Sequence, residues 1–293
     1  MLTAAVRDLH ACYPGAYATD VRTSCPDLWQ NNPHITPLEE SDPEAETIDC
    51  HYPLIHQSNT RPYHFIHGFI SYLNEVLQLD IQPTLFKGDV HLSDDEKEWT
   101  SHIQDGIGEG MRYWLINAGG KRDFTTKWWP VERFQSVVDH FQGAIEFVQI
   151  GEAGHVHQPL RGVIDLLGAT SLRQLVRLVY TADGCLSPVS LLMHLAEAVD
   201  TRSGMPQNRP CVVVAGGREP PHWEAYPHHQ FIHTVGMLLC CDNGGCWKAR
   251  VVPLNDGSPL DDPEMLCVQP INGVPRCMNM IKPDDVIRRI EGY

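Results

Sequence analysis

Residues 163–199 read VIDLLGATSLRQLVRLVYTADGCLSPVSLLMHLAEAV, and their alternation of short apolar runs with helical patterns indicates the fold class. The runs at 163–167 and 184–187 predict two buried strands. Residues 171–180 and 190–199 carry apolar side chains at helical spacing and predict the helices that follow each strand. Strands that alternate with helices in this way predict a parallel sheet covered by helices, which is an α/β fold.

The same alternation extends on both sides of this stretch. Residues 113–117 (YWLIN), 145–150 and 211–215 (CVVVA) predict three further strands. A helix is expected at 130–141, because Pro130 suits a first helical turn, and a last helix is expected at 283–290. Residues 111–282 are therefore expected to form one sheet-containing domain, followed by a C-terminal helix at 283–293.

Residues 1–110 are expected to form a separate unit. Three glycines at 106–110 predict a linker at its end. Within the unit, the apolar spacing predicts a strand at 18–23 and a short helix and turn at 26–35. Helices are predicted over the first residues (MLTAAVRDLH), over residues 64–79 and over residues 94–103.

Length and charge narrow the class of protein. The chain has 293 residues, enough for two domains that each bury a core. Its 22 basic and 37 acidic residues give a net charge of −15, which argues against a nucleic-acid binder. The sequence contains no apolar run of membrane-spanning length and no secretory leader pattern, so a reducing cytoplasm is expected.

Five of the ten cysteines lie within the 38 residues from 240 to 277. In a reducing compartment, such crowding favours a tetrathiolate metal site, while free or disulfide-bonded cysteines remain the alternative. Counted from Cys241, the intervening lengths are 4, 20 and 9 residues, which gives two pairs around a strand-like insertion at 249–254. Four of five residues are expected to bind the metal: Cys240, Cys241, Cys246, Cys267 and Cys277. The other cysteines are expected to be ordinary small buried residues: Cys12, Cys25, Cys50, Cys185 and Cys211.

Three loops follow predicted strands, at the sheet edge where parallel α/β sheets bind ligands. In the first loop, glycines would let the backbone approach a diphosphate and cations would neutralise it; a solvated turn is the structural alternative. The candidate donor-binding residues there are Gly119, Gly120, Lys121, Thr126 and Lys127.

The second and third loops each offer one further group. The Glu152 carboxylate is placed to accept hydrogen bonds from ribose hydroxyls, with an exposed glutamate as the alternative. Ser190 is expected to cap the helix that contains His194, and the free N–H groups of that helix would attract an anion. A plain cap with a packed histidine is the alternative there. We expect the three loops to converge on one crevice.

Several motifs resemble the C-terminal domain of family 9 glycosyltransferases, the ADP-heptose transferases. They are KWWP at 127–130, LGATSL at 167–172 and MHLA at 193–196. The cysteine-rich insertion is similar to the metal finger of the bacterial protein heptosyltransferases that modify autotransporters. The resemblance covers residues 111–293 well and 1–110 more loosely.

The resemblance implies a GT-B architecture of two Rossmann-like domains. Residues 1–110 would face the acceptor, residues 111–282 would bind the nucleotide sugar and carry a metal finger at about 238–280, and the last helix would cross back onto the first domain. The donor would be ADP-heptose, and the acceptor a hydroxyl on a protein or lipopolysaccharide. Lys127 would contact the donor phosphates, Glu152 the ribose, and Ser190 and His194 would line the phosphate-binding helix. Because the family needs no metal for transfer, the cysteines would hold a structural zinc or iron ion.

Two departures from the family pattern leave questions open. The family's expected general base is an aspartate in a loop before the first helix, and this chain begins at Met1 inside that helix. The N-terminal domain is therefore expected to lack its first strand and the catalytic residue is unknown; a start codon assigned too late is favoured over a truncated, inactive form. Val189 stands where the family has a sugar-binding aspartate, so the exact sugar is open.

The alternatives to an active transferase are of two kinds. One is a non-catalytic nucleotide-sugar-binding or scaffold protein. The other, an NAD-dependent enzyme, is disfavoured because the chain lacks a GxGxxG motif. A homo-oligomer is compatible with either reading. His64 and His67 are expected to be a surface pair, and Trp223 with Glu224 either covers a bound nucleotide or acceptor or packs as a loop.

Overall fold

The computed structural model describes residues 1–39, 41–50, 63–98, 103, 112–241 and 244–293. Its centre is a six-stranded sheet with the order β5-β3-β1-β6-β7-β8, in which all neighbours are parallel. The α/β prediction is therefore confirmed. The strands are β1 (Arg112–Ile116), β3 (Ile145–Gly151), β5 (Ile164–Leu167), β6 (Gly184–Pro188), β7 (Cys211–Gly216) and β8 (Gln230–His233).

The strands differ in how clearly their sequences reveal them. Every residue of β7 is buried, as a strand covered on both faces requires, and its apolar run was predicted. β8 was missed because its half-buried sequence QFIH gives no apolar run. Cys185 and Cys211 are register partners on β6 and β7 and are fully buried, as predicted. Cys25 is exposed and Cys12 and Cys50 are half-buried, so the prediction that they are buried is wrong.

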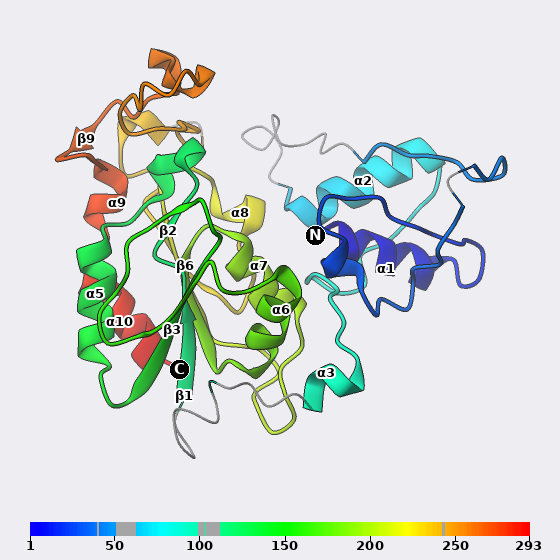
Figure 1. The fold of residues 1–293 in the computed structure, drawn as a ribbon. Coiled ribbons are helices and arrows are strands. Elements are labelled where there is room, and N and C mark those ends of the chain that lie inside the picture. The colour runs from blue at the N-terminus through cyan, green and yellow to red at the C-terminus, as the bar shows by residue number, and fades with distance from the viewer. Residues whose placement is uncertain (40, 51–62, 99–102, 104–111, 242–243) are drawn as a thin grey trace.

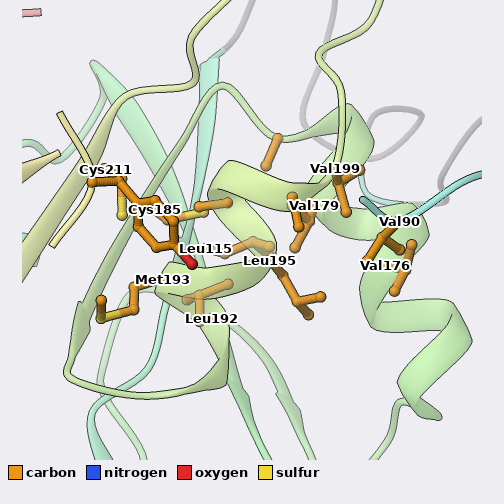
Figure 2. Close-up of a cluster of buried hydrophobic side chains, with 14 of the residues drawn as sticks. Val90, Leu115, Val176, Val179, Cys185, Leu192, Met193, Leu195, Val199 and Cys211 are labelled. Carbon is orange, nitrogen blue, oxygen red and sulfur yellow. The ribbon is translucent and has the colours of Figure 1, made fainter. Parts of the chain in front are cut away.

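Helices cover both faces of the sheet (Figure 1). Alternate residues of β1 point to opposite faces. Trp114 packs in the core cluster that contains residues of α5 (Val131–His140) and α10 (Pro283–Glu291). Leu115 packs in the cluster that contains residues of α6 (Leu172–Thr181) and α7 (Leu191–Ala198), where Figure 2 shows it among Cys185, Leu192 and Leu195.

The C-terminal helix α10 packs on α5 and β7, within the sheet domain. Val286 and Ile290 are its buried residues, and both belong to the core cluster of Trp114. These contacts of α10 lie within the sheet domain, and the predicted crossing of this helix onto the N-terminal residues stays a prediction.

The N-terminal part contains α1 (Leu2–Cys12), α2 (Phe65–Leu77) and α3 (Asp94–Glu98), and α1 packs against α2. The strand predicted at 18–23 is wrong, since that region makes only a single bridge, Thr19 to Ile35. No strand of a sheet lies among the described residues that precede β1. The predicted linker at 106–110 and most of residues 99–103 lie outside the described residues, and a Rossmann-like N-terminal domain stays a prediction.

Contacts along α6 and α7 join the two parts of the chain. Arg173 on α6 donates to Glu96 on α3, with an Nε to Oε1 distance of 2.6 Å, and to the carbonyl oxygen of His91, also at 2.6 Å. Val90 forms a bridge with Val199 and lies beside it in the shared core (Figure 2). The two parts therefore bury apolar surface together.

Short elements complete the described fold. None of the described helices is long and apolar enough to cross a membrane. The strand-like insertion expected at 249–254 is wrong: the segment makes one isolated bridge, between Arg250 and Leu266. The short strands are β2 (Gly119–Gly120) paired with β4 (Val156–His157), and β9 (Pro270–Ile271) paired with β10 (Val274–Pro275). The short helices are η1 (Pro26–Trp29), η2 (Arg122–Lys127), α8 (Pro221–Glu224), η3 (Leu239–Cys241), η4 (Pro259–Asp261), η5 (Pro263–Met265) and α9 (Arg276–Met280).

Candidate functional site

The three predicted loops lie at the carboxyl edge of the sheet. Asn117, just after β1, has its side-chain nitrogen 3.4 Å from the Ser190 hydroxyl, just after β6. β2 pairs with β4, which brings the glycines after β1 against the loop after β3. Gly119 is required for this approach, because a Cβ there would lie 2.2 Å from the carbonyl oxygen of Val156.

Lys127 is the donor-binding candidate with the clearest electrostatic setting. Its Nζ lies 2.9 Å from Oε1 of Glu219, and the two side chains are 22% and 4% exposed. Glu219 also pairs with Arg218, whose guanidinium stacks on Phe124 with 4.5 Å to the ring centre. One carboxylate is thus shared by two cations. Burial lowers the pKa of Lys127 to about 8, Arg218 adds to this, and Glu224 opposes it.

Glu224 lies at the end of α8, close to this ion pair. Its side chain is 4% exposed, and among the described residues its Oε1 has no hydrogen-bond partner. Burial raises the pKa of this carboxyl, against the influence of Lys127 and Arg218. Burial thus disfavours the charged form of Glu224, and Glu219 is the carboxylate within ion-pair distance of both Lys127 and Arg218. The cluster therefore favours an incoming anion.

The side chains of His194, on α7, and of Ser190, at its N-cap, have hydrogen-bond partners that differ from those predicted. Nδ1 of His194 lies 3.2 Å from the hydroxyl of Tyr226, and burial holds the pKa of this histidine well below its usual value, so the ring is neutral at pH 7. Ser190 is at the N-cap position, but its side chain makes no capping hydrogen bond; it meets the Asn117 amide instead. The predicted side-chain cap is wrong, and the first-turn N–H groups of α7 are left without it.

Three other predicted residues take no part in the Lys127 ion pair. The hydroxyl of Thr126 is 2.7 Å from the Lys248 carbonyl oxygen and 2.9 Å from that of Ala249, so it is directed to the cysteine-rich segment rather than to a donor. Lys121 is exposed. The Glu152 carboxylate is 73% exposed and lies 3.4 Å from Nε2 of His155.

Sequence reasoning did not assign Arg218 and Glu219 to the donor site, although both belong to the loop that follows β7. The rule that ligands bind at the carboxyl ends of parallel strands applies to this loop as well, and would have found them. For Trp223 and Glu224 the sequence left two interpretations open: a cover over a bound nucleotide or acceptor, or a packed loop. The Trp223 ring packs against those of Phe65 and Trp247, with ring centres 4.2 Å and 4.7 Å away, which supports the packed-loop reading for this tryptophan.

The histidines of α2 also differ from expectation. His64 is 3% exposed and caps α2, accepting a hydrogen bond from the Ile66 N–H at its Nδ1. Its ring centre lies 5.2 Å from that of Tyr226, so it belongs to the contact between the two parts of the chain. The expected surface pair with His67 is therefore wrong for His64.

The cysteine-rich segment places four thiols around one cavity. Cys240, Cys246, Cys267 and Cys277 line it, whereas Cys241 is turned away and accepts a hydrogen bond from the Gly236 N–H at 3.2 Å. Burial raises the pKa of Cys246 to about 11. No disulfide bond links the described cysteines. Over the part of the chain that is described, no group of three or more His, Cys, Asp or Glu side chains is arranged to hold a metal ion, so the predicted metal site is not shown.

Comparison with known proteins gives a family match and several structural matches. A sequence model described as glycosyltransferase family 9 (heptosyltransferase) matches residues 55–203, just over half of the chain. No curated protein sequence matches the chain. Escherichia coli ADP-heptose lipopolysaccharide heptosyltransferase II is 16% identical and has a TM-score of 0.57, over 99% of this chain and 93% of that one. That similarity shows a shared overall fold.

Two further structures align less completely. The dodecameric iron-containing heptosyltransferase TibC of enterotoxigenic E. coli, solved with ADP-D-β-D-heptose, is 16% identical with a TM-score of 0.49, over 80% of this chain and 53% of that one. A family 9 glycosyltransferase of Veillonella parvula is 16% identical with a TM-score of 0.44, over 59% and 50%. This chain thus spans about half the length of these two proteins. From the family match, the chain belongs to glycosyltransferase family 9, the heptosyltransferase family.

Proposed function

We propose that this chain has the two-domain GT-B architecture and transfers a sugar, heptose from ADP-heptose, to a hydroxyl group on a protein or lipopolysaccharide acceptor. Family membership supports sugar transfer in general. The observation that carries the donor class is the buried cluster of Lys127, Arg218 and Glu219 at the carboxyl edge of the sheet. Two cations that share one carboxylate form a natural seat for a diphosphate, which carries more negative charge than the carboxylate does.

The proposed role of these groups is to stabilise the leaving nucleoside diphosphate. As the bond between the sugar and the diphosphate breaks, negative charge grows on the departing phosphate oxygen. The Lys127 ammonium and the first-turn N–H groups of α7, which begins directly after Ser190, would both face that charge. The acceptor hydroxyl must also lose a proton to a base, and we assign no described residue to that step.

We further propose that the cavity thiols hold a structural zinc or iron ion. The ligands would be Cys240, Cys246, Cys267 and Cys277, because Cys241 is turned away from the cavity. Four sulfur donors suit either metal, and a bound cation would offset the burial that raises the pKa of the Cys246 thiol. When bound, the ion would cross-link the segment and take no part in transfer. A reducing cytoplasm, the proposed location, would keep these thiols free.

Calorimetric titration tests the donor proposal. We expect the wild-type chain to bind ADP-heptose and ADP, and Lys127→Ala to weaken both by at least about tenfold, since a charge-assisted hydrogen bond contributes about 1.5–3 kcal/mol. Lys97→Ala, which removes an exposed cation on α3, serves as the matched control and should bind as wild type. A wild-type chain that binds no nucleotide diphosphate would overturn the proposal. If the wild-type chain binds ADP-heptose but transfers sugar to no acceptor, the non-catalytic alternative is favoured.

A further inference from the structure

The segment 246–251, here called the strap, runs from the cysteine cavity across the loop that carries Arg218 and Glu219. The N–H of Cys246 donates to the Gly217 carbonyl oxygen at 3.1 Å, and the N–H of Trp247 donates to that of Arg218 at 3.1 Å. Gly245 comes so close to this loop that a Cβ on it would lie 2.5 Å from the Arg218 carbonyl oxygen. The strap therefore lies directly on the loop after β7.

The same strap is bonded to the loop that carries Lys127. The Thr126 N–H donates to the Ala249 carbonyl oxygen at 3.2 Å, and the Thr126 hydroxyl reaches the carbonyl oxygens of Lys248 and Ala249. Nε of Arg218 donates to that same Lys248 oxygen at 2.8 Å. One strap carbonyl thus joins the residue before Lys127 to the second cation of the cluster.

The position of the strap depends on its cavity end. Cys246 lines the cavity together with Cys267 and Cys277, and the next residue, Trp247, has a φ of +57°. A bulky side chain is disfavoured in this left-handed conformation, which persists only where contacts on both sides hold it. Here those contacts are the cavity wall on one side and the bonds to Lys248 on the other.

We propose that Thr126 and the strap are positioning elements for Lys127 and Arg218, so that the integrity of the four-cysteine cavity sets the affinity for the donor diphosphate. This inference rests on the proposed function, because it takes a nucleoside diphosphate as the ligand. Lys127 and Glu219 come from two separate loops, and the strap spans both. A displacement of about 1 Å between these loops is enough to move Lys127 and Arg218 out of the geometry that suits a bound phosphate.

Paired substitutions at Thr126 separate this role from simple packing. Thr126→Val keeps the shape and removes the hydroxyl, whereas Thr126→Ser keeps the hydroxyl. We expect Thr126→Val to weaken ADP binding about tenfold in calorimetric titration, as the loss of one or two buried hydrogen bonds implies, and Thr126→Ser to bind close to wild type. Gly245→Ala should act like Thr126→Val, because the added methyl group pushes the strap away from the Arg218 loop.

The cavity end is tested with Cys267→Ser. We expect this variant to weaken ADP binding as well, with a loss of metal content measured in the purified protein as an independent readout. Combined with Thr126→Val, its effect should be clearly less than additive, because both changes release the same strap. Urea midpoints of the variants confirm that the sheet domain is folded.

The outcomes separate the two proposals. If the wild type binds no ADP, the proposed function fails and this inference fails with it. If the wild type binds ADP and Thr126→Val and Gly245→Ala bind equally well, the inference alone is overturned. Fully additive effects of Cys267→Ser and Thr126→Val would also overturn it.

Discussion

The sheet domain and the cysteine-rich segment are stabilised in opposite ways. Every residue of β7 is buried, and Trp114 on β1 is 1% exposed. In the segment, by contrast, Leu239 is 86% exposed and Val268 60% exposed, so large apolar side chains lie on the surface. The sheet is held by burial of apolar area, which tolerates change at many points. The segment contributes Cys277 and Met278 to the core cluster of Trp114, and elsewhere it relies on particular polar contacts.

Arg250 shows most clearly how polar contacts stabilise the cysteine-rich segment. Its side chain is 1% exposed, and its guanidinium lies 2.7 Å from carboxylate oxygens of both Asp256 and Asp261. Asp261 in turn accepts hydrogen bonds from the N–H groups of Leu254 and Asn255. A single arginine thus organises the loop in place of a hydrophobic core.

The largest effect is expected in the sheet. Trp114→Ala should lower the free energy of unfolding by about 3–5 kcal/mol, because it leaves a cavity under Gly184, where the tryptophan ring fills the space that a Cβ would occupy. Urea unfolding followed by circular dichroism measures this loss in the free energy of unfolding. A loss below about 1 kcal/mol would mean that apolar packing at β1 does not hold this domain together.

A local effect is expected in the cysteine-rich segment. Arg250→Met keeps the apolar stem but leaves Asp256 and Asp261 without their shared cation. We expect amide hydrogen exchange to rise about tenfold or more at Leu254 and Asn255, with no change in β7. Equal acceleration in β7 would show instead that the two regions unfold as one unit.

Lys127 lies where the two regions meet, and its titration gives a pH dependence. Its pKa of about 8 means that the ammonium is present below pH 8 and is lost above it. Affinity for ADP should therefore fall as pH rises from 7.5 to 9.5, by up to about tenfold per unit above 8. The contribution of this group to stability runs the other way: a lowered lysine pKa disfavours folding below pH 8, and this penalty fades as pH rises toward 10.5.

Titrations at several pH values check the affinity. Lys127→Arg serves as the control, since a guanidinium stays protonated and should flatten the profile. An unchanged wild-type affinity at pH 9.5 would remove Lys127 from the binding site.

The smallest effect is expected at the exposed apolar surface. Leu239→Ser should change the free energy of unfolding by less than about 0.5 kcal/mol, because the side chain is 86% exposed and loses little burial. Thermal unfolding of the variant and of the wild type, measured side by side, checks this change in stability. A loss well above that range would indicate that Leu239 is covered in the protein as it exists in solution.

The regions also differ in how far sequence predicts them. Apolar runs located β1, β3 and β7 because strands buried on two faces leave continuous apolar sequence. β5 lies at a sheet edge and none of its residues is fully buried, but its sequence IDLL still contains enough apolar residues to be recognised. The strand predicted at 18–23 is wrong because its apolar residues make no sheet and lie mostly near the surface. β8, at the other edge, was missed because its sequence QFIH offers only two adjacent apolar residues.

At the site, residue type was easier to predict than direction. The sequence identified Lys127, which the structure places in a buried ion pair, but it also assigned Thr126, whose hydroxyl is directed to the strap. Adjacent residues such as Cys240 and Cys241 have the same chemistry, and only the local turn decides which thiol faces the cavity. Glu219 follows β7 and so lies at the edge where ligands bind, but its pairing with Lys127 joins two loops far apart in the sequence and is seen only in the structure.

The most direct test of the account is a crystal structure of the chain with ADP-heptose. We expect the diphosphate at the carboxyl edge of the sheet, with a phosphate oxygen within hydrogen-bond distance of Lys127 Nζ and close to the first turn of α7. A nucleotide bound elsewhere, with the ion pair between Lys127 and Glu219 intact, would contradict the proposed donor site.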